Sequence, residues 1–582
     1  MQAPASGSLA YRPDIQILRA VAVLLVILFH LNVRGFSSGF LGVDVFFVIS
    51  GYLMQRLYGQ CTPASEFYLR RARRLFPAYF GTIAATLLLS AFVTLPGEFS
   101  QVAEQSMFAS VLSSNIGFWL QTSYFENSYF RPLLHLWSLG VEAQFYLIFP
   151  LLTRLRRRWF FVVLAGSLIA CWSAIEVSPK LPFFMAPFRV WEFGLGMLAA
   201  NCPYQGNRQF GVLALSGLVA LAFVPLNGQS LSIVSGHPGV IALAITSLTA
   251  TTLVLKLPEG LEASLPGKVA QWIGDVSYSL YLAHFPVIVL MNYHPFAGTI
   301  LGGGLLTLLV IAAATLSLYF GLERNGPKLF SYRRTLGAVF AICALALAGP
   351  RLQMMAFPQR EQRIFAGLND RSTYRCGKLF RIFHPRERFC PIAEGEPILL
   401  VGDSHADAIK ESFAGVAHHY GWGTLLSVDN DPLERRDLSA RWLRYEADTR
   451  HARWVFLHFA NENLSWKMLA DSEAALGSRL VLIEPTPSFP RSVPLMLYRR
   501  HAAAPLPVPS GVDAYIAAHP ELTVIRTLPS LCDTVCALQD SRGHPYYFDS
   551  AHLTLTGARA LKPAFDHFFR THAPKQLDRQ IR

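Results

Sequence analysis

The chain has 582 residues, of which 52% are hydrophobic and only 15% are charged, and its mean hydropathy is +0.33. Soluble domains usually carry about 25% charged residues, so this composition excludes a disordered chain, a collagen-like chain and a small disulfide scaffold. The formal net charge is +13. The basic residues lie beside long apolar stretches, which is typical of loops at the cytoplasmic face of a bilayer. The sequence therefore predicts a polytopic membrane protein with the lipid bilayer as a partner, and no nucleic-acid partner.

A series of apolar stretches approaches the ~20 residues that are needed to cross a bilayer. They lie at about 15–33, 39–57, 76–95, 104–121, 138–154, 160–176, 186–200, 210–226, 238–256, 277–293, 299–321 and 335–350. The stretch at 104–121 is the most polar of them, and we expect it to be re-entrant or interfacial. The remaining stretches predict an all-α membrane domain at 11–330, with about ten transmembrane helices, and one additional linking helix at 331–352.

The basic loops predict the orientation of these helices. Arginines at 70–74 follow the second stretch and arginines at 154–158 follow the stretch at 138–154, so both loops are expected in the cytoplasm. Lys328, Arg333 and Arg334 precede the last helix and are expected on the same side. The odd number of crossings then places the N-terminus in the cytoplasm. Everything after Pro350 is expected outside, which in a bacterium is the periplasm.

The expected exported part contains an even number of cysteines. These are Cys376, Cys390, Cys532 and Cys536. In an oxidising compartment this number predicts two disulfides, Cys376–Cys390 and Cys532–Cys536. A zinc site is the alternative, but neither spacing is that of a Cys-x-x-Cys motif, so we expect no metal.

Several polar residues fall inside the apolar stretches, where they are costly and usually functional. Arg19 and His30 are eleven residues apart, which places them within ~20° of the same helix face and ~16 Å apart along the axis. The alternative is that Arg19 reaches the interface and His30 only forms a hydrogen bond within the bundle. The other polar residues expected in the membrane core are Asp44, Glu142, Arg189, Glu192, Asp275 and His284.

Three longer segments accompany the Arg19–His30 pair. They are GVDVFFVISGYL at 42–53, LWSLGVEAQFYL at 136–147 and GDVSYSLYLAHFP at 274–286. Together they resemble the integral-membrane acyltransferase-3 family over about 11–330. The resemblance implies that an acyl group from cytoplasmic acyl-CoA crosses the membrane, with Arg19 and His30 as an essential pair. It also implies that an arginine cluster binds the acyl donor, here Arg71, Arg73 and Arg74.

Two positions depart from the family pattern. Ala143 stands where the family has the second of two glutamates, which puts a role for that glutamate in doubt. The Glu-x-Pro signature is loosened to 323–327, which blurs the end of the last core helix.

The expected exported part reads as an α/β domain at 396–575, preceded by an extension at 353–395. The run PILLVG at 397–402 predicts a buried strand that ends at Asp403 and Ser404, and the following segment reads as a helix. A serine at such a turn is exposed at the carboxyl edge of a sheet. Apolar runs at about 424–428, 453–459, 479–484 and 522–526 alternate with helical patterns, which predicts a three-layer sandwich with a mostly parallel sheet.

A nucleophilic serine needs a base and an orienting group. Asp549 and His552 lie three residues apart in one predicted turn. Together with Gly-Asp-Ser-His at 402–405, this turn resembles the SGNH hydrolase superfamily over about 395–570. The resemblance implies Ser404 as nucleophile, His552 as base and Asp549 as orienter, with His405 as the alternative base.

The SGNH superfamily also uses an asparagine in the oxyanion hole. Asn461 and Asn463 are the candidates, and we prefer Asn461. A backbone amide near Ser427 is expected in place of the superfamily's glycine.

The combination of both domains resembles the fused architecture that O-acetylates bacterial surface glycans. It implies transfer of acetyl from cytoplasmic acetyl-CoA to a glycan hydroxyl, with lipopolysaccharide O-antigen as the expected acceptor. It also implies a multi-pass protein of the bacterial inner membrane. The alternatives are a peptidoglycan acceptor, a transporter with an appended esterase, and a membrane-anchored carbohydrate esterase.

Overall fold

The computed structural model describes residues 11–572, apart from 59–63, 121–129, 294–299, 375–386, 429–439, 500–511 and positions 177, 205, 227, 229, 231, 373, 462 and 534. The chain divides into two compact units, Met1–Gln353 and Met354–Arg582. We call them the membrane unit and the C-terminal unit and describe each by itself.

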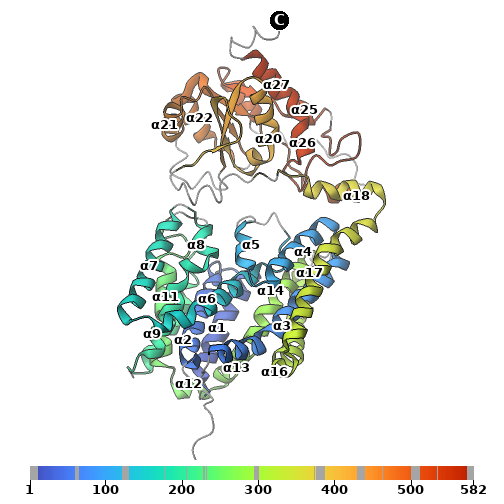
Figure 1. The fold of residues 1–582 in the computed structure, drawn as a ribbon. Helices are drawn as coiled ribbons and strands as arrows, with labels where there is room; N and C mark the ends of the chain where they lie inside the picture. The colour runs from blue at the N-terminus through green and yellow to red at the C-terminus, as the bar shows by residue number, and fades with distance from the viewer. Residues whose placement is uncertain are drawn as a thin grey trace, which may run out of the picture. The chain divides into compact units, whose positions relative to one another are not determined.

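The membrane unit is built of helices (Figure 1). Among the described residues, seven helical segments are long and apolar enough to cross a bilayer. They contain α1 (Pro13–His30), α2 (Gly42–Tyr58), α3 (Ala64–Val93), α6 (Trp137–Arg154), α7 (Arg157–Ile175), α15 (Ile300–Leu318) with η5 (Tyr319–Glu323), and α17 (Tyr332–Met355). Two further helices, α13 (Leu265–Asp275) and α14 (Ser277–Tyr293), are bent by 71° and make an eighth segment if they count as one. The prediction of a helical membrane domain is confirmed.

Three of the expected spans are shorter than a bilayer requires. They are α9 (Val190–Asn201), α10 (Gln209–Leu221) and α11 (Val240–Leu255), with 12, 13 and 16 residues. Local breaks end these helices before the apolar sequence does. For example, α11 begins after Pro238 and Gly239 and ends at Lys256, whose φ is +64°. Within the described parts of the chain, seven or eight segments therefore have the length of a span, where the sequence predicted about ten and one linking helix.

The segment that we expected to be re-entrant or interfacial is divided into two helices. It forms α4 (Pro96–Ser110) and α5 (Ser114–Leu120), which are separated by a turn at Leu112 with a φ of +58°. The remaining short helices of the membrane unit are η1 (Gly39–Leu41), η2 (Leu134–Leu136), α8 (Lys180–Phe184), η3 (Ala186–Phe188), α12 (Glu259–Ala263) and α16 (Gly326–Leu329).

Glycines bring α2 and α9 into close contact. A Cβ added to Gly51 would lie 2.0 Å from the carbonyl oxygen of Phe193, and one added to Gly196 would lie 2.0 Å from that of Val48. Small residues at helix interfaces let backbones approach within a membrane. The approach of α9 to α2 brings Arg189, at the start of α9, to Asp44, at the start of α2.

The C-terminal unit contains a six-stranded sheet in the order β1-β3-β2-β4-β5-β6. Only β1 (Cys390–Pro391) is antiparallel to its neighbour. The other strands are β2 (Glu396–Gly402), β3 (Trp422–Val428), β4 (Val455–His458), β5 (Leu480–Ile483) and β6 (Thr523–Ile525). Each predicted apolar run overlaps one of the five parallel strands, so the mostly parallel sheet is confirmed.

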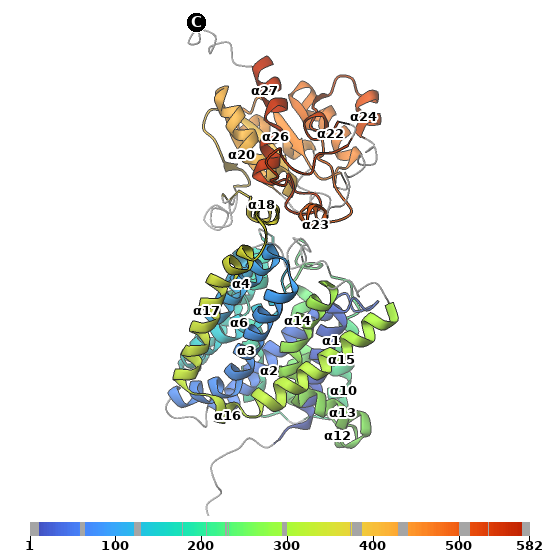
Figure 2. The ribbon, with the colours of Figure 1, turned by 90° about the vertical axis from the view of Figure 1, so that its right-hand side faces the viewer.

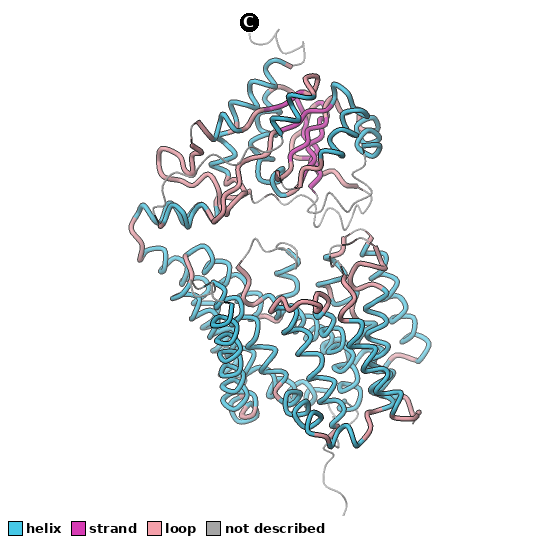
Figure 3. The backbone as a smooth tube through the Cα atoms, turned by 180° about the vertical axis from the view of Figure 1, so that it is seen from behind, coloured by secondary structure: helices cyan, strands magenta, loops and turns pink. Residues whose placement is uncertain are grey.

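Helices cover both faces of the sheet (Figure 3). One layer contains α20 (Ser404–His419) and α27 (Lys562–Thr571), which meet where Phe413 packs against Phe565 and Phe569. The other contains α21 (Ala440–Thr449) and α22 (Trp466–Leu476). The remaining helices are α18 (Gln359–Ala366), η6 (Gly367–Asn369), η7 (Gly477–Arg479), α23 (Val493–Tyr498), α24 (Val512–Ala518), α25 (Leu528–Leu531) and α26 (Leu555–Ala560). Of these, α18 and α23 lie side by side (Figure 2).

Candidate active site

Ser404 lies where β2 passes directly into α20. The end of β2 leaves no room for a side chain, because a Cβ added to Gly402 would lie 1.8 Å from the carbonyl oxygen of His458 on β4. Asp403 is the N-cap of α20 and accepts a hydrogen bond of 2.8 Å from the amide of His405. Ser404 is therefore the first residue of a helix at the carboxyl edge of a parallel sheet, where a helix N-terminus favours a developing negative charge.

Ser404, His552 and Asp549 form one hydrogen-bonded relay. The Oγ of Ser404 lies 2.7 Å from Nε2 of His552, and Nδ1 of His552 lies 2.7 Å from Oδ2 of Asp549. A carboxylate only accepts, so Nδ1 of His552 carries a hydrogen, and in the neutral ring Nε2 has the lone pair that faces the hydroxyl. This arrangement can remove the proton of Ser404 as its oxygen attacks a carbonyl carbon.

Backbone amides hold the carboxylate of Asp549 in place. Its Oδ1 accepts from the amides of Ala551 and His552 at 2.8 and 2.7 Å. Burial acts to raise the pKa of Asp549, but the hydrogen bonds and the charge of His552 outweigh it and keep this pKa below its ordinary value. The carboxylate therefore remains ionised and able to orient His552.

The alternative base, His405, has a different environment. Its Nδ1 lies 3.2 Å from Oγ1 of Thr486, whereas the hydroxyl of Ser404 faces His552. Burial, together with repulsion from His552, lowers the pKa of His405. Its geometry suits a buried neutral ring that supports the neighbouring His552, at a centroid distance of 4.7 Å.

Asp403 connects the nucleophile turn to the end of β4. Its Oδ2 accepts from the amide of Ala460 at 2.9 Å and from Nδ2 of Asn463 at 2.8 Å, and the side chain is only 1% exposed. Asn463 is thus drawn to the nucleophile turn, whereas the preferred oxyanion candidate, Asn461, is exposed. The sequence did not identify this role of Asp403, because its partners lie 57 and 60 residues away.

The segment that bears Asp549 and His552 is fixed from several sides. The ring of Phe548 stacks on His552 at 5.4 Å, and the guanidinium of Arg371 lies 4.1 Å from the centre of the Phe548 ring. The carbonyl oxygens of Ser550 and Asp549 accept from the amides of Phe489 and Val493 at 2.7 and 3.0 Å. The loop therefore has a defined shape without regular secondary structure.

Asp370, which directly precedes Arg371, anchors the C-terminal end of the segment that bears Asp549 and His552. Its Oδ2 accepts from the amide and the hydroxyl of Thr556 at 3.0 and 2.6 Å. The oxygen of Thr554 caps α26 by accepting from the amide of Gly557 at 2.9 Å. Residues just before the predicted α/β domain thus support the segment that bears Asp549 and His552, which sequence motifs did not reveal.

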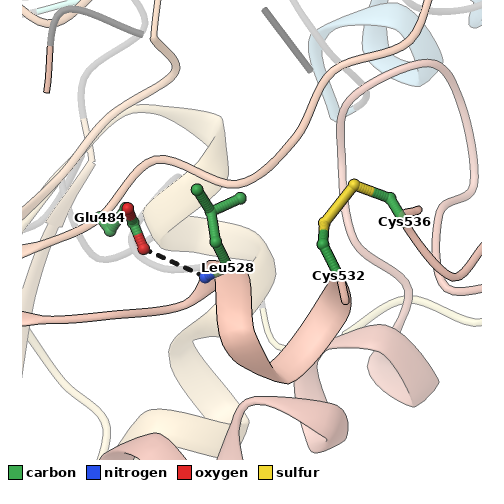
Figure 4. The surroundings of a disulfide bond; sticks show 4 residues. All are labelled: Glu484, Leu528, Cys532 and Cys536. Carbon is green, nitrogen blue, oxygen red and sulfur yellow. Dashed lines mark hydrogen bonds between the residues drawn. A yellow bond between two sulfur atoms is a disulfide. The ribbon is translucent and has the colours of Figure 1, made fainter. Parts of the chain in front are cut away.

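One of the two predicted disulfides is present among the described residues. Cys532 and Cys536 are bonded, at the end of the short helix α25 (Figure 4). The start of α25 is held by Glu484, whose carboxylate accepts from the amide of Leu528 at 3.1 Å. Cys390 is also disulfide-bonded, but its predicted partner Cys376 lies outside the described residues.

In the membrane unit, Arg19 and His30 both belong to α1 but have different neighbours. The Nη1 of Arg19 donates to Oε1 of Gln16 at 3.1 Å. The same guanidinium interacts electrostatically with four charged residues, Arg74, Glu323, Asp275 and Glu142. His30, at the other end of α1, lies with its Nδ1 3.2 Å from Nε2 of His284 on α14.

The polar residues around Arg19 come from several helices. Glu142 accepts hydrogen bonds from Ser50 and Tyr146, and Glu323 accepts from the hydroxyl of Ser279 at 2.6 Å. Asp275 lies 3.5 Å from the hydroxyl of Tyr11. The structure thus brings two of the predicted core carboxylates, Glu142 and Asp275, into the electrostatic environment of Arg19 together with Glu323.

The predicted donor-binding arginines lie on α3. Arg73 and Arg74 are exposed, and the guanidinium of Arg71 lies 5.8 Å from the centre of the Tyr146 ring. Because Tyr146 also donates to Glu142, the arginine cluster adjoins the group of charged residues around Arg19.

Asp44, Arg189 and Glu192 form a separate buried network. The Nη1 of Arg189 lies 2.9 Å from Asp44 and 2.5 Å from Glu192, and all three side chains are at most 1% exposed. The Nη2 of Arg189 lies 3.1 Å from Nε2 of His237. Truncating Arg189 would leave two buried carboxylates without their cation, so this residue links the start of α9 to the start of α2.

Among the described residues no group of three or more His, Cys, Asp or Glu side chains could hold a metal ion.

Two family models match this chain. One describes an acyltransferase domain and matches residues 12–324, and the other describes an SGNH domain fused to AT3 domains and matches residues 375–567. The chain is 30% identical over 335 residues to the "Putative membrane-bound transacylase BcsY" of Komagataeibacter xylinus. The aligned region covers 54% of this chain and 83% of that protein.

Two O-acetyltransferases are also similar. The O-acetyltransferase OatA of Staphylococcus aureus is 32% identical over 321 residues, covering 50% of this chain and 53% of that protein. The peptidoglycan O-acetyltransferase OatA of Listeria monocytogenes is 29% identical over 314 residues, covering 48% and 50%. The chain thus spans about half the length of these two proteins.

Among solved structures, the periplasmic domain of a lipopolysaccharide acetyltransferase from Salmonella ser. Paratyphi A matches with a TM-score of 0.28 and 16% identity. The match covers 37% of this chain and 99% of that domain.

Proposed function

The chain belongs to the acyltransferase family whose model matches residues 12–324, and we propose that it is a membrane O-acetyltransferase that modifies a hydroxyl of a surface glycan. The observation that carries the proposal is the Ser404–His552–Asp549 relay, present on the same chain as an acyltransferase membrane domain. The membrane domain can carry an acyl group and Ser404 can form an ester with it. The two domains thus supply two consecutive steps of one transfer.

The acyl donor in this proposal is cytoplasmic acetyl-CoA. The exposed Arg73 and Arg74, with Arg71 beside them, offer the charged fork that phosphates bind. Arg19 lies within the electrostatic range of Arg74, so positive charge continues from the cluster towards α1. His30 acts in the membrane core as base or transient acceptor of the acetyl group.

In the C-terminal unit, Ser404 takes the acetyl group. Its Oγ attacks the carbonyl carbon while Nε2 of His552 takes the proton of Ser404, and as the bond to the previous carrier breaks His552 gives this proton to the leaving carrier and is again a neutral base. A glycan hydroxyl then loses its proton to His552 and attacks the acetyl-serine, and Ser404 regains a proton from His552. The same relay would hydrolyse the ester if water replaced the glycan, so acceptor binding must exclude water.

We place the protein in a bacterial inner membrane with the C-terminal unit in the periplasm. Two observations support this orientation. The first is the pair of arginine clusters, at 70–74 in the first turns of α3 and at 154–158 where α6 meets α7. The second is the Cys532–Cys536 disulfide, which persists in an oxidising compartment.

Lipopolysaccharide O-antigen is the acceptor that we test first, because the fused architecture of the chain resembles enzymes that modify it. Peptidoglycan is the second candidate, since the Listeria relative is named for that polymer.

Mass spectrometry of surface glycans tests the proposal. Cells with the wild type, with Ser404→Ala or without the protein are compared after digestion of both lipopolysaccharide and peptidoglycan. We expect an acetyl increment on one polymer with the wild type only, which also identifies the acceptor. Loss of acetyl from a pre-acetylated glycan, with no increment on either polymer, would show an anchored esterase instead.

A further inference from the structure

Two acidic side chains of the membrane unit share one arginine. Asp44 is the third residue of α2 and Glu192 is the third residue of α9. One oxygen of Asp44 lies 2.9 Å from Nη1 of Arg189, and one oxygen of Glu192 lies 2.5 Å from the same nitrogen. The two carboxyl groups are also hydrogen-bond partners of each other. The acetyl transfer proposed for the chain makes no use of this buried pair.

The next neighbour of Arg189, His237, adds no positive charge. Nη2 of Arg189 lies 3.1 Å from Nε2 of His237, and a guanidinium only donates. The Nε2 of His237 therefore has a lone pair, and the ring is neutral with its hydrogen on Nδ1. The thiol of Cys171, on α7, interacts electrostatically with the network and donates to the carbonyl oxygen of Pro238 at 3.5 Å. Among the residues that the structure describes, Arg189 is thus the one cation in contact with the two carboxyl groups.

The pair must therefore hold one proton. A carboxylate only accepts hydrogen bonds, so two carboxyl groups that are hydrogen-bonded to each other need a hydrogen between them. The charges agree, since two buried carboxylates beside one guanidinium would leave an uncompensated negative charge. Oε2 of Glu192 is buried and accepts no hydrogen bond from any described residue, as expected of the oxygen that bears the hydrogen. Glu192 is thus the acid of the pair, and Asp44 is the acceptor.

Opposing effects act on this proton. Burial favours the neutral acid, whereas Arg189 and the N-termini of α2 and α9 favour the carboxylate. Because these effects oppose each other, the proton can leave and return. Two carboxyl groups that share one proton are also the arrangement with which aspartic proteases carry out acid–base chemistry.

The proposed reaction needs a proton to move inward. When acetyl leaves CoA, the carbon–sulfur bond breaks with its electron pair on sulfur, and the thiolate takes up a proton in the cytoplasm. The glycan hydroxyl gives up its proton on the outer side, where His552 passes one proton in each cycle to the leaving carrier. Each acetyl group that crosses outward therefore leaves one proton to return inward. Without this return, the transfer would work against the membrane potential.

We propose that Glu192 and Asp44 form a proton-binding site of the membrane unit, which takes up one proton and releases it again in each acetyl transfer. Glu192 holds the proton, Asp44 accepts its hydrogen bond, and Arg189 balances the carboxylate that remains when the proton leaves. This inference rests on the proposed function and adds a proton to the acetyl group that the membrane unit moves.

Two substitutions separate proton exchange from packing. Glu192→Gln keeps the size of the side chain and can donate an amide hydrogen to Asp44, but it cannot release that hydrogen. Glu192→Asp can release a proton but is one methylene shorter. Cys171→Ser is the matched control, because it changes a neighbouring residue and keeps a donor for Pro238. The full chain is assayed in membrane vesicles for glycan acetylation with isotope-labelled acetyl-CoA, and for hydrolysis of an activated ester, which reports Ser404.

We expect Glu192→Gln to lower kcat for glycan acetylation about 100-fold, and Glu192→Asp to remain at least about tenfold faster than Glu192→Gln, as for other groups that exchange protons. The KM for acetyl-CoA and the ester hydrolysis should stay unchanged in both variants, and Cys171→Ser should stay within about twofold of the wild type. A merely structural role would give the opposite order, because glutamine reproduces the size and the hydrogen bond of the protonated acid, whereas aspartate leaves a gap.

Infrared spectroscopy of the purified full chain detects the proton directly. The spectrum of the wild type minus that of Glu192→Gln should contain the carbonyl stretch of a protonated carboxyl group. Two results would overturn the inference: a kcat of Glu192→Gln that equals or exceeds that of Glu192→Asp, or a difference spectrum without this band. Failure of the proposed function looks different, since then the wild type itself transfers no acetyl to any glycan, whereas the infrared band is unaffected.

Discussion

Two Asp–His pairs occur close together in the C-terminal unit, and only one of them reaches a nucleophile. Asp540 and His544 lie 3.0 Å apart, much like Asp549 and His552 at 2.7 Å. Hydrogen bonds from amides and from the histidine keep the pKa of both carboxylates below the ordinary value, against the effect of burial. Stability from such a pair is present above the ordinary aspartate pKa of about 3.9 and is lost only as the pH falls through the lower folded value.

We therefore expect Asp549→Asn to lower the rate of activated-ester hydrolysis by about 10³- to 10⁴-fold. An amide at this position can donate to Nδ1 of His552 and so favours the wrong tautomer. The rate is measured with the full chain in membranes. Asp540→Asn is the matched control and should change the rate by less than about twofold, because the Asp540–His544 pair makes no contact with Ser404 in the relay. Similar losses in both variants would mean that the substitutions disturb the fold of the loop and do not act through the tautomer of His552.

The residues of the relay could be predicted from the sequence because each lies in a short motif. Ser404 follows a buried apolar run, and Asp549 and His552 share one turn. The hydrogen bonds that Asp403 accepts from Ala460 and Asn463 could not be predicted in this way, since they depend on how β2 pairs with β4. The pairing of His30 with His284 escaped for the same reason, because it joins residues 254 positions apart.

At the scale of elements, Asp549 and His552 belong to a segment between α25 and α26 whose described residues form no long strand or helix. Isolated bridges join Cys532 to Cys536, Gln539 to Pro545 and Tyr547 to Leu553. The disulfide closes the first bridge, and Asp370 anchors the far end through Thr556. Sequence patterns predict regular elements well, but they carry little information on a loop that is held by such distributed contacts. The same limit explains why the sequence did not predict the lengths of α10 and α11, since in both the apolar pattern extends beyond the helix.

Replacing both Cys532 and Cys536 with serine should destabilise the C-terminal unit by about 2 kcal/mol, the loop-closure entropy of so short a ring. Ester hydrolysis should fall by less than about tenfold, because the contacts of Ser550, Asp549 and Thr556 remain. Pulse proteolysis in urea measures the stability. Cys202→Ser, which removes an exposed free cysteine, is the control for the substitution itself. A complete loss of hydrolysis in the double variant would show that the disulfide alone positions His552.

At the scale of the whole molecule, the two units are proposed to act in series on one acetyl group. The sequence motifs of both units are complete enough to predict this division of labour, because each half of the reaction needs its own side chains. Each unit holds its own predicted residues in a contact of its own: His30 with His284 in the membrane unit, and Ser404 with His552 in the C-terminal unit. A serial scheme makes a prediction that neither half makes alone.

His30→Ala and Ser404→Ala should both abolish acetylation of the glycan, but they should differ when an activated ester is supplied from outside. His30→Ala leaves the Ser404–His552–Asp549 relay intact, so it should hydrolyse the ester at the wild-type rate, whereas Ser404→Ala should not hydrolyse it at all. Glycan acetylation is read by mass spectrometry and ester hydrolysis by the released chromophore. If His30→Ala keeps acetylating the glycan, acetyl reaches Ser404 by a route that bypasses the membrane unit. If it loses ester hydrolysis too, the two units do not fold or act independently, because a defect in one has then disabled the chemistry of the other.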